Sequence, residues 1–186
     1  MTHTKSNRPQ SPKLIILNTR DIKSLNEKIL AQFSADFDFS PYAVLKNNED
    51  KIFLVTMDIA RIDLCKLRIN SMGIYFGKIE DSSDSGLRLS IEGSQLIGPH
   101  AKKNVVEVSK EQTVEWMAGR TVSIDLSDKK SADIKGHVIM RFKEDFLGCG
   151  KIIKKHGPAN NSDDVLRFEI LNYVSKGRRI KMHDGS

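Results

Sequence analysis

The sequence predicts an α+β protein in two parts, a mixed α/β part followed by a small closed β-barrel. In the first part, strand-length apolar runs alternate with a segment whose apolar residues recur at helical spacing. In the second, short strands follow one another with polar or glycine turns between them. The charge balance changes as well, since residues 1–92 carry 13 Lys/Arg and 12 Asp/Glu, and residues 93–186 carry 17 and 12.

Gly98-Pro99 is the break between the two parts. We therefore expect an N-terminal α/β domain at residues 1–93, a linker at 94–103 and a C-terminal domain at 104–182.

The chain's first predicted strand, residues 13–17, leads into a helix. Asn18 or Thr19 can cap that helix, and Asp21 suits its first turn. Its predicted apolar face consists of Ile22, Leu25, Ile29, Leu30 and Phe33.

Two pairs of strands complete the predicted N-terminal part. Strands at 41–45 and 52–55 flank the loop Asn47–Asp50, and strands at 73–79 and 87–91 flank a polar loop. A short helix over 58–67 is expected between the pairs, with Cys65 as a buried apolar residue. Ser94 is a possible helix cap before the break.

The C-terminal part begins with a predicted strand at 105–108 and a helix at 110–117. Ser109 and Gln112 have the spacing of a capping box, and Gly119 can end the helix. Further strands are predicted at 121–126, 136–142, 146–153 and 166–171.

Gly148 and Gly150 lie inside the strand predicted at 146–153. Because they are two residues apart, they share one face, and such a strand bends, bulges or admits another backbone closely. One interpretation is a corner of the barrel. The other is a surface where a sugar-phosphate backbone approaches and meets Lys151.

The composition is that of a basic globular protein with an anionic partner. The formal net charge is +6, and residues 151–186 alone hold 8 basic and 4 acidic residues. The two cysteines form no Cys-x-x-Cys pair, so a reducing compartment is expected. No apolar run reaches the roughly 20 residues of a membrane span, and no signal core is visible near Met1, so we expect a cytoplasmic protein with no membrane contact.

No credible catalytic set, metal site or cofactor site is found in the sequence. It has no phosphate-binding Gly-x-x-x-x-Gly-Lys-Ser/Thr loop, and its five histidines are scattered singly. His137 is expected to be a satisfied or solvated histidine, and a Cys149–His156 nucleophile pair has no third group to orient it. We therefore expect no enzymatic activity.

The basic residues of the C-terminal part form the more coherent pattern. Arginine and lysine clusters contact phosphates, although any single lysine is usually only solvated. The expected RNA-contacting set is Lys102, Lys103, Arg120, Gly148, Gly150, Lys151, Lys154, Lys155, Lys176, Arg178, Arg179 and Lys181.

The C-terminal half resembles the PUA domain, an RNA-binding module. The matching segments are 104–108, 116–122, 146–152 and 171–180. Gly73–Ile79 followed by Leu87–Gly98 also resembles the domain junction of the Nip-seven family of ribosome-biogenesis factors. Ser175 and Gly177 depart from the proline and acidic residue expected there.

The resemblance implies a PUA-type pseudobarrel and a noncatalytic RNA-binding protein that acts in large-subunit ribosomal RNA maturation. It also implies ribosomal or precursor RNA as the partner, with ribosome-assembly proteins on the N-terminal domain. The alternative is an RNA-modification enzyme, or its accessory subunit, that uses the PUA domain to position substrate RNA. A third hypothesis, compatible with the first, is an adaptor whose N-terminal domain docks a protein.

Overall fold

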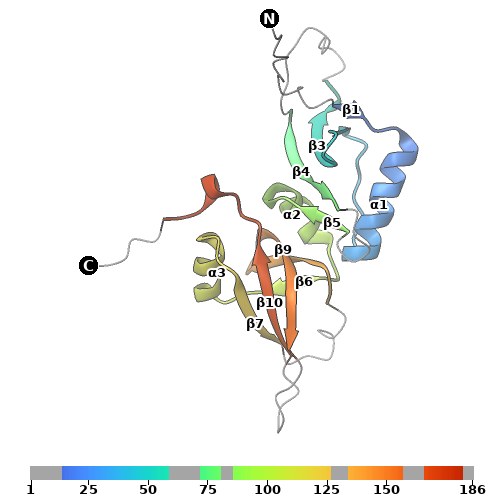
Figure 1. The fold of residues 1–186 in the computed structure, drawn as a ribbon. Coiled ribbons are helices and arrows are strands. Elements are labelled where there is room, and N and C mark those ends of the chain that lie inside the picture. The colour runs from blue at the N-terminus through green and yellow to red at the C-terminus, as the bar shows by residue number, and fades with distance from the viewer. Residues whose placement is uncertain (1–13, 59–71, 81–85, 127–133, 157–165, 182–186) are drawn as a thin grey trace, which may run out of the picture.

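The computed structural model describes residues 14–58, 72–80, 86–126, 134–156 and 166–181 (Figure 1). Within these residues the chain forms two β-sheets with helices beside them, which confirms the mixed α/β character. The helix predicted over 58–67, including Cys65, lies almost entirely outside the described residues.

The N-terminal sheet is an antiparallel meander in chain order. Its hairpin between the second and third strands is closed by Asn47, whose side chain accepts hydrogen bonds from the backbone of Glu49 at 3.0 Å and Lys51 at 2.9 Å. This matches the predicted hairpin loop. The strands are β1 (Ile15–Ile16), β2 (Tyr42–Lys46), β3 (Lys51–Thr56), β4 (Ile74–Ile79) and β5 (Leu87–Leu89).

Helix α1 (Thr19–Phe33) covers this sheet (Figure 1). Asn18 caps it, accepting hydrogen bonds from the backbone N–H groups of Arg20 and Asp21. Leu25, Ile29 and Phe33 are buried as predicted, but Leu30 is 58% exposed. The expectation for Leu30 is wrong because one residue turns a helix by about 100°, which carries Leu30 off the stripe that includes Ile29.

The C-terminal sheet has the order β6-β8-β9-β10-β7 and curls into a half-barrel. The β6–β8 pair is parallel and the other pairs are antiparallel. Among the described residues no pairing joins the edge strands β6 and β7, so the expected full closure of the barrel is wrong; the chain between them forms a helix instead of a closing strand. The strands are β6 (Val105–Glu107), β7 (Val122–Leu126), β8 (His137–Phe142), β9 (Asp145–His156) and β10 (Leu166–Asn172).

Helix α3 (Lys110–Met117) starts with the predicted capping box. Gln112 donates its backbone N–H to Ser109 Oγ at 3.2 Å, and its side-chain oxygen accepts the Ser109 backbone N–H at 2.8 Å. Gly119 follows the helix with a φ of +83°. Trp116 is fully buried and donates Nε1–H to the carbonyl of Leu147 at 3.0 Å, which attaches the helix to β9.

The two glycines of β9 serve the packing of the sheet. Met140 pairs with Gly148 and Arg141 with Phe146, so Leu147 is the extra residue of a bulge, and Gly148 takes a φ of +114° beside it. A Cβ on Gly150 would lie 2.8 Å from Trp116 Cη2, so the missing side chain admits the tryptophan. The structure therefore supports the barrel-corner interpretation.

Helix α2 (Ile91–Ile97) lies between the two sheets and contacts β4 and β9 (Figure 1). Ser90 caps it, accepting the Gly93 N–H at 2.9 Å, so the expected cap at Ser94 and the strand running to residue 91 are wrong. A Cβ on Gly93 would lie 2.0 Å from the Phe76 carbonyl oxygen, which shows how closely α2 approaches β4.

The segment expected as a linker is helical and partly buried. It contains the end of α2 and the 3-10 helix η3 (Gly98–His100), with Ile97 and Gly98 buried. One core packs α1 against the N-terminal sheet and extends to Ile139 and Cys149 of the C-terminal sheet, while a second surrounds Trp116. The two sheets are therefore packed against each other.

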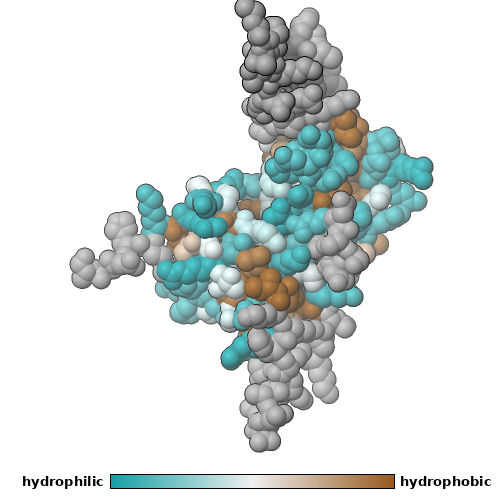
Figure 2. All heavy atoms as spheres, in the orientation of Figure 1, coloured by the Kyte–Doolittle hydropathy of each residue, from teal (hydrophilic) through white to brown (hydrophobic). Residues whose placement is uncertain are grey.

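Hydrophilic side chains cover most of the face in Figure 2, with brown apolar patches between them. The exposed apolar residues include Ile153 on β9 and Leu171 on β10. None of the helices in the described ranges is long and apolar enough to cross a membrane.

Candidate nucleic-acid interface

Four of the predicted RNA-contacting residues lie on the exposed segment that follows β10. The segment includes the 3-10 helix η5 (Lys176–Arg178). All four basic side chains of the segment are exposed. We call residues 173–181 the C-terminal segment; its basic residues are Lys176, Arg178, Arg179 and Lys181.

The C-terminal segment is fixed to the end of α3. Ile180 donates its backbone N–H to Met117 at 3.0 Å, and Arg179 donates Nε–H to the Val174 carbonyl at 3.0 Å. The Arg179 side chain also occupies the space beside Gly119, where a Cβ would lie 2.2 Å from its Nε. Arg179 therefore helps to hold the segment in place, a role that the sequence did not suggest.

Arg120 is brought to the same end of α3, next to the glycine that Arg179 covers. It forms two hydrogen bonds with the carboxylate of Glu115, at 2.8 and 3.0 Å. Both side chains are exposed, so this ion pair contributes little to stability and an RNA phosphate can compete for the arginine.

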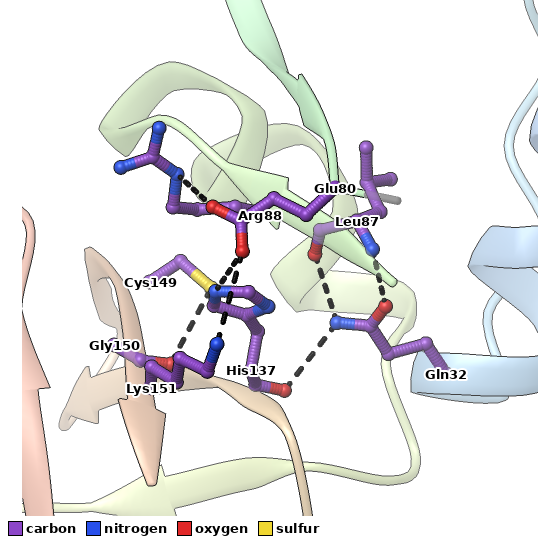
Figure 3. A network of polar contacts seen from close by, with 8 residues as sticks. All are labelled: Gln32, Glu80, Leu87, Arg88, His137, Cys149, Gly150 and Lys151. Carbon is purple, nitrogen blue, oxygen red and sulfur yellow. Dashed lines mark hydrogen bonds and ion pairs between the residues drawn. The ribbon is translucent and has the colours of Figure 1, made fainter. Parts of the chain in front are cut away.

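Lys151 lies in a polar network between the sheets and not on the open surface (Figure 3). Its Nζ is 4.0 Å from Glu80 Oε2, and the side chain is 34% exposed. The same carboxylate approaches Arg88 Nε at 3.2 Å and His137 Nε2 at 3.7 Å. The network therefore holds Lys151 beside a carboxylate, which reduces its availability to a phosphate.

Gln32 connects α1 with both sheets (Figure 3). Its side-chain amide donates to the Leu87 carbonyl and accepts the Leu87 N–H, each at 2.8 Å, and also donates to the His137 carbonyl at 3.4 Å. His137 is fully buried, and its backbone carbonyl is part of the junction between the sheets.

The remaining predicted residues are divided between other places. Lys102 and Lys103 donate their backbone N–H groups to the Phe33 carbonyl at the end of α1. Lys154 and Lys155 pair through their backbones with β10, and their side chains lie outside the described residues. The structure does not gather the predicted set into one patch.

Gly148 and Gly150 do not expose their backbone to a ligand on the side where a side chain would project. Both are buried, and the positions of their missing side chains are occupied by Ile91 at Gly148 and by Trp116 and Ile170 at Gly150. The prediction that these glycines contact RNA through bare backbone is therefore wrong, because buried side chains fill the space that they leave.

Cys149 between them is fully buried, and burial raises the pKa of its thiol to about 12. The thiol is therefore protonated and inert at neutral pH, which agrees with its exclusion as a nucleophile.

A cavity of about 450 Å³ lies beside the C-terminal segment. Its walls come from β4 and β5, from the start of α2 and from the residues after β10. The polar and aromatic residues that line it are Tyr75, Arg88, Ser90, Glu92, Tyr173, Ser175 and Arg178.

Two pairs of side chains organise this cavity. The Arg88 guanidinium lies over the Tyr173 ring, 4.4 Å from its centre, in a cation–π contact. Arg178 Nη2 forms an ion pair with Glu92 Oε1, and Arg178 remains 54% exposed. The cavity thus presents a stacked guanidinium, a carboxylate and a second, exposed guanidinium.

The carboxylate of Glu92 stays ionised in this setting. Burial raises its pKa, but hydrogen bonds from its own backbone N–H and from Arg178 outweigh burial and leave the pKa below its ordinary value of 4.5. Burial raises the pKa of the Tyr173 hydroxyl, and the charge of Glu80 adds to the effect, so the phenol remains protonated at neutral pH.

The residues predicted from the sequence to contact RNA include none of Arg88, Glu92 and Tyr173. Arg88 alternates with Leu87 and Leu89 on β5, which marks it only as a polar strand position. No local pattern shows that residues 88–92 lie beside 173–178, because the fold alone brings these distant segments together.

Residues 103–162 match the family model described as "Methyltransferase RsmF PUA domain", which confirms the predicted PUA domain. Ribosomal RNA small subunit methyltransferase F of Aeromonas salmonicida is 30% identical over 125 residues, which are 67% of this chain and 24% of that protein. Its counterpart from Vibrio parahaemolyticus is 28% identical over 86 residues, 46% of this chain and 17% of that protein. The chain spans about a quarter or less of the length of these relatives.

These similarities correct two predictions. The relatives are named as small-subunit RNA methyltransferases and the matched domain is a methyltransferase PUA domain, so the predictions of a noncatalytic large-subunit factor and of no enzymatic activity are wrong. The resemblance to the Nip-seven family receives no support from these matches. They favour the alternative, a protein of RNA modification.

Proposed function

We propose that this chain binds RNA through its PUA domain and positions small-subunit ribosomal RNA for methylation, as the RNA-binding portion of an RNA-modification enzyme. The observation that carries the proposal is the match of residues 103–162 to a methyltransferase PUA domain. The names of the relatives supply the substrate class and the reaction.

The arrangement of charge supports RNA as the ligand. The C-terminal segment exposes Lys176, Arg178 and Lys181 together, and the backbone hydrogen bond from Ile180 to Met117 of α3 holds the segment in a defined position. Basic side chains on a fixed surface neutralise phosphates and set the register of the bound RNA. The cavity beside the segment adds groups that can contact a nucleotide.

Salt-dependent binding of small-subunit ribosomal RNA fragments tests the RNA-binding part of the proposal. Replacing Lys176 and Lys181 by alanine should weaken binding and flatten the slope of log affinity against log salt by about two units, one for each phosphate contact. Lys23→Ala with Lys28→Ala removes the same charge from exposed positions of α1 and is the matched control. An equal effect of both double variants would show that only net charge matters.

Methylation in the native cells tests the rest of the proposal. Mass spectrometry of small-subunit ribosomal RNA should show reduced methylation at one or more nucleotides when the lysine double variant replaces the wild type. The control double variant should leave every nucleotide methylated as before. Unchanged methylation in both strains refutes a role in this modification.

Three narrower predictions accompany the proposal. We propose the division into residues 1–93, 94–103 and 104–182, a cytoplasmic location, and a protein partner on the N-terminal part. The last is supported by exposed apolar side chains there, at Ile15, Ile16 and Met57.

A further inference from the structure

We infer that the cavity between β4–β5, α2 and the C-terminal segment binds one unstacked nucleotide of single-stranded RNA and favours guanine. The inference rests on the proposed function and adds a site and a base preference to it. Its basis is the constellation of Arg88, Tyr173, Glu92 and Arg178 around one opening.

The size and chemistry of the cavity suit a nucleotide. A volume of about 450 Å³ falls within the range of small-molecule sites. Tyr75 and Tyr173 supply aromatic surface, while Ser90, Ser175 and the charged residues supply polar contacts. Sequence-specific RNA recognition uses this combination, in which a splayed base stacks on a planar side chain and its edge forms hydrogen bonds.

The stacking surface already exists in the structure. The Arg88 guanidinium is held over the Tyr173 ring on one side and beside Glu80 on another, at 3.2 Å from Nε. Because these contacts restrain the Arg88 side chain, little side-chain entropy is lost when a base packs against it. A nucleobase can therefore extend the stack from Tyr173 through Arg88.

Glu92 provides the base preference. An ionised carboxylate only accepts hydrogen bonds, and its two oxygens match two neighbouring donors. Guanine has two such donors on its Watson–Crick edge, N1–H and the N2 amine. Adenine and cytosine place an acceptor beside their amine, and uracil has a single N–H between two acceptors, so these bases match the carboxylate less well.

Arg178 links the base contact with the phosphate backbone. It is exposed at the opening and is now paired with Glu92 Oε1. A phosphate that binds Arg178 draws the guanidinium from Glu92 and leaves that oxygen to the base edge. Binding of the phosphate and of the base should therefore reinforce each other.

The test uses the whole chain and short uridine-rich RNAs with one central nucleotide varied. Fluorescence anisotropy should show the guanosine RNA binding about tenfold more tightly than the inosine RNA, because inosine lacks the N2 amine and loses one charge-assisted hydrogen bond. Glu92→Gln should abolish this difference. Tyr173→Phe should preserve it, and Tyr173→Leu should weaken binding of every RNA by removing the ring under Arg88.

Arg167→Ala is the matched control for Arg178→Ala. Arg167 is 60% exposed and, like Arg178, is paired with a carboxylate, that of Asp125 across β7 and β10. Loss of Arg178 should reduce the preference for guanosine, whereas loss of Arg167 should not. Equal binding of guanosine and inosine RNAs by the wild type overturns the inference and requires no variant to fold.

The outcomes separate this inference from the proposed function. Salt-dependent binding of ribosomal RNA fragments without any preference at the central nucleotide overturns the nucleotide pocket and leaves the proposed function standing. Absence of RNA binding overturns both. A tenfold preference that Glu92→Gln removes supports both.

Discussion

Replacing Gly150 by alanine should destabilise the protein by about 2 kcal/mol. The new Cβ would lie 2.4 Å from Ile170 Cγ2, 2.8 Å from Trp116 Cη2 and 3.0 Å from the Leu171 carbonyl oxygen. Ile170 and Trp116 are buried, and the carbonyl belongs to a strand paired with β9, so none of the three can move aside freely.

The magnitude follows from two opposing effects. Overpacking a rigid core costs about 1–3 kcal/mol, and three close neighbours place this site near the upper end. Alanine restricts the unfolded chain and returns about 0.4–1 kcal/mol. The difference is about 2 kcal/mol, which for a chain of this length lowers the melting temperature by about 4–8 °C.

Urea unfolding followed by the fluorescence of Trp116, the single tryptophan of the chain, measures this change in the core that contains Gly150. Gly177→Ala is the matched control, because nothing lies within 4 Å of its added Cβ. That control should be neutral or slightly more stable than the wild type. Equal stability of the two variants would refute the assignment of Gly150 to packing. Reduced RNA affinity of a fully folded Gly150→Ala variant would restore the glycine to the binding surface.

Three more predictions concern the junction between the sheets. Gln32→Leu should lower the free energy of unfolding in urea by about 2 kcal/mol, because it leaves the N–H and the carbonyl of Leu87 without their side-chain hydrogen-bond partner. The control Gln95→Leu, on the exposed side of α2, should lower it little. Because the pKa of Glu92 is lower in the folded protein than its ordinary value of 4.5, the ion pair of Glu92 with Arg178 stabilises the fold above pH 4.5. This stabilisation is lost as the pH falls through the pKa of Glu92 in the folded protein. Arg178→Ala should therefore make the free energy of unfolding fall less steeply as the pH is lowered through this range. Cys149→Ser should not change the extent of thiol labelling of the native protein at neutral pH, since that thiol is buried with a pKa of about 12, and any decrease would contradict its burial.

The sequence predicts those features of the fold that depend on local patterns. The cap at Asn18, the capping box at Ser109 and the bend at the β9 glycines follow from residue type and spacing, and the structure contains each of them. The predicted stripe of α1 is buried at Leu25, Ile29 and Phe33. The failures concern contacts across the fold. Ser90 and not Ser94 caps α2, and the backbone N–H of Ser90 is bonded to the Phe76 carbonyl of β4 at 2.9 Å, a contact that no local pattern reveals.

For the predicted binding residues too, local sequence patterns are informative and contacts across the fold are not foreseen. Charge counting finds the C-terminal segment correctly as an exposed basic surface, because the segment is contiguous in the chain. It also selects Lys151, which the fold places beside Glu80, and it omits Arg88, which the fold places over Tyr173. Whether a basic residue faces solvent or a partly buried carboxylate depends on strand pairing and packing, and no single-sequence pattern specifies either.

The packing of the two sheets bears on what the RNA-binding surface can do. A surface that only raised affinity could stand on a separate, mobile domain. Here the cavity walls come from the N-terminal sheet, α2 and the C-terminal segment, with Arg88 on β5 and Tyr173 just after β10. Gln32 connects α1 to β5 and β8. RNA bound at the C-terminal segment, as we propose, is therefore also held in a fixed orientation relative to the N-terminal part. The proposed role in methylation requires such a fixed orientation, since catalysis demands placement of the reacting atom to well under about 1 Å.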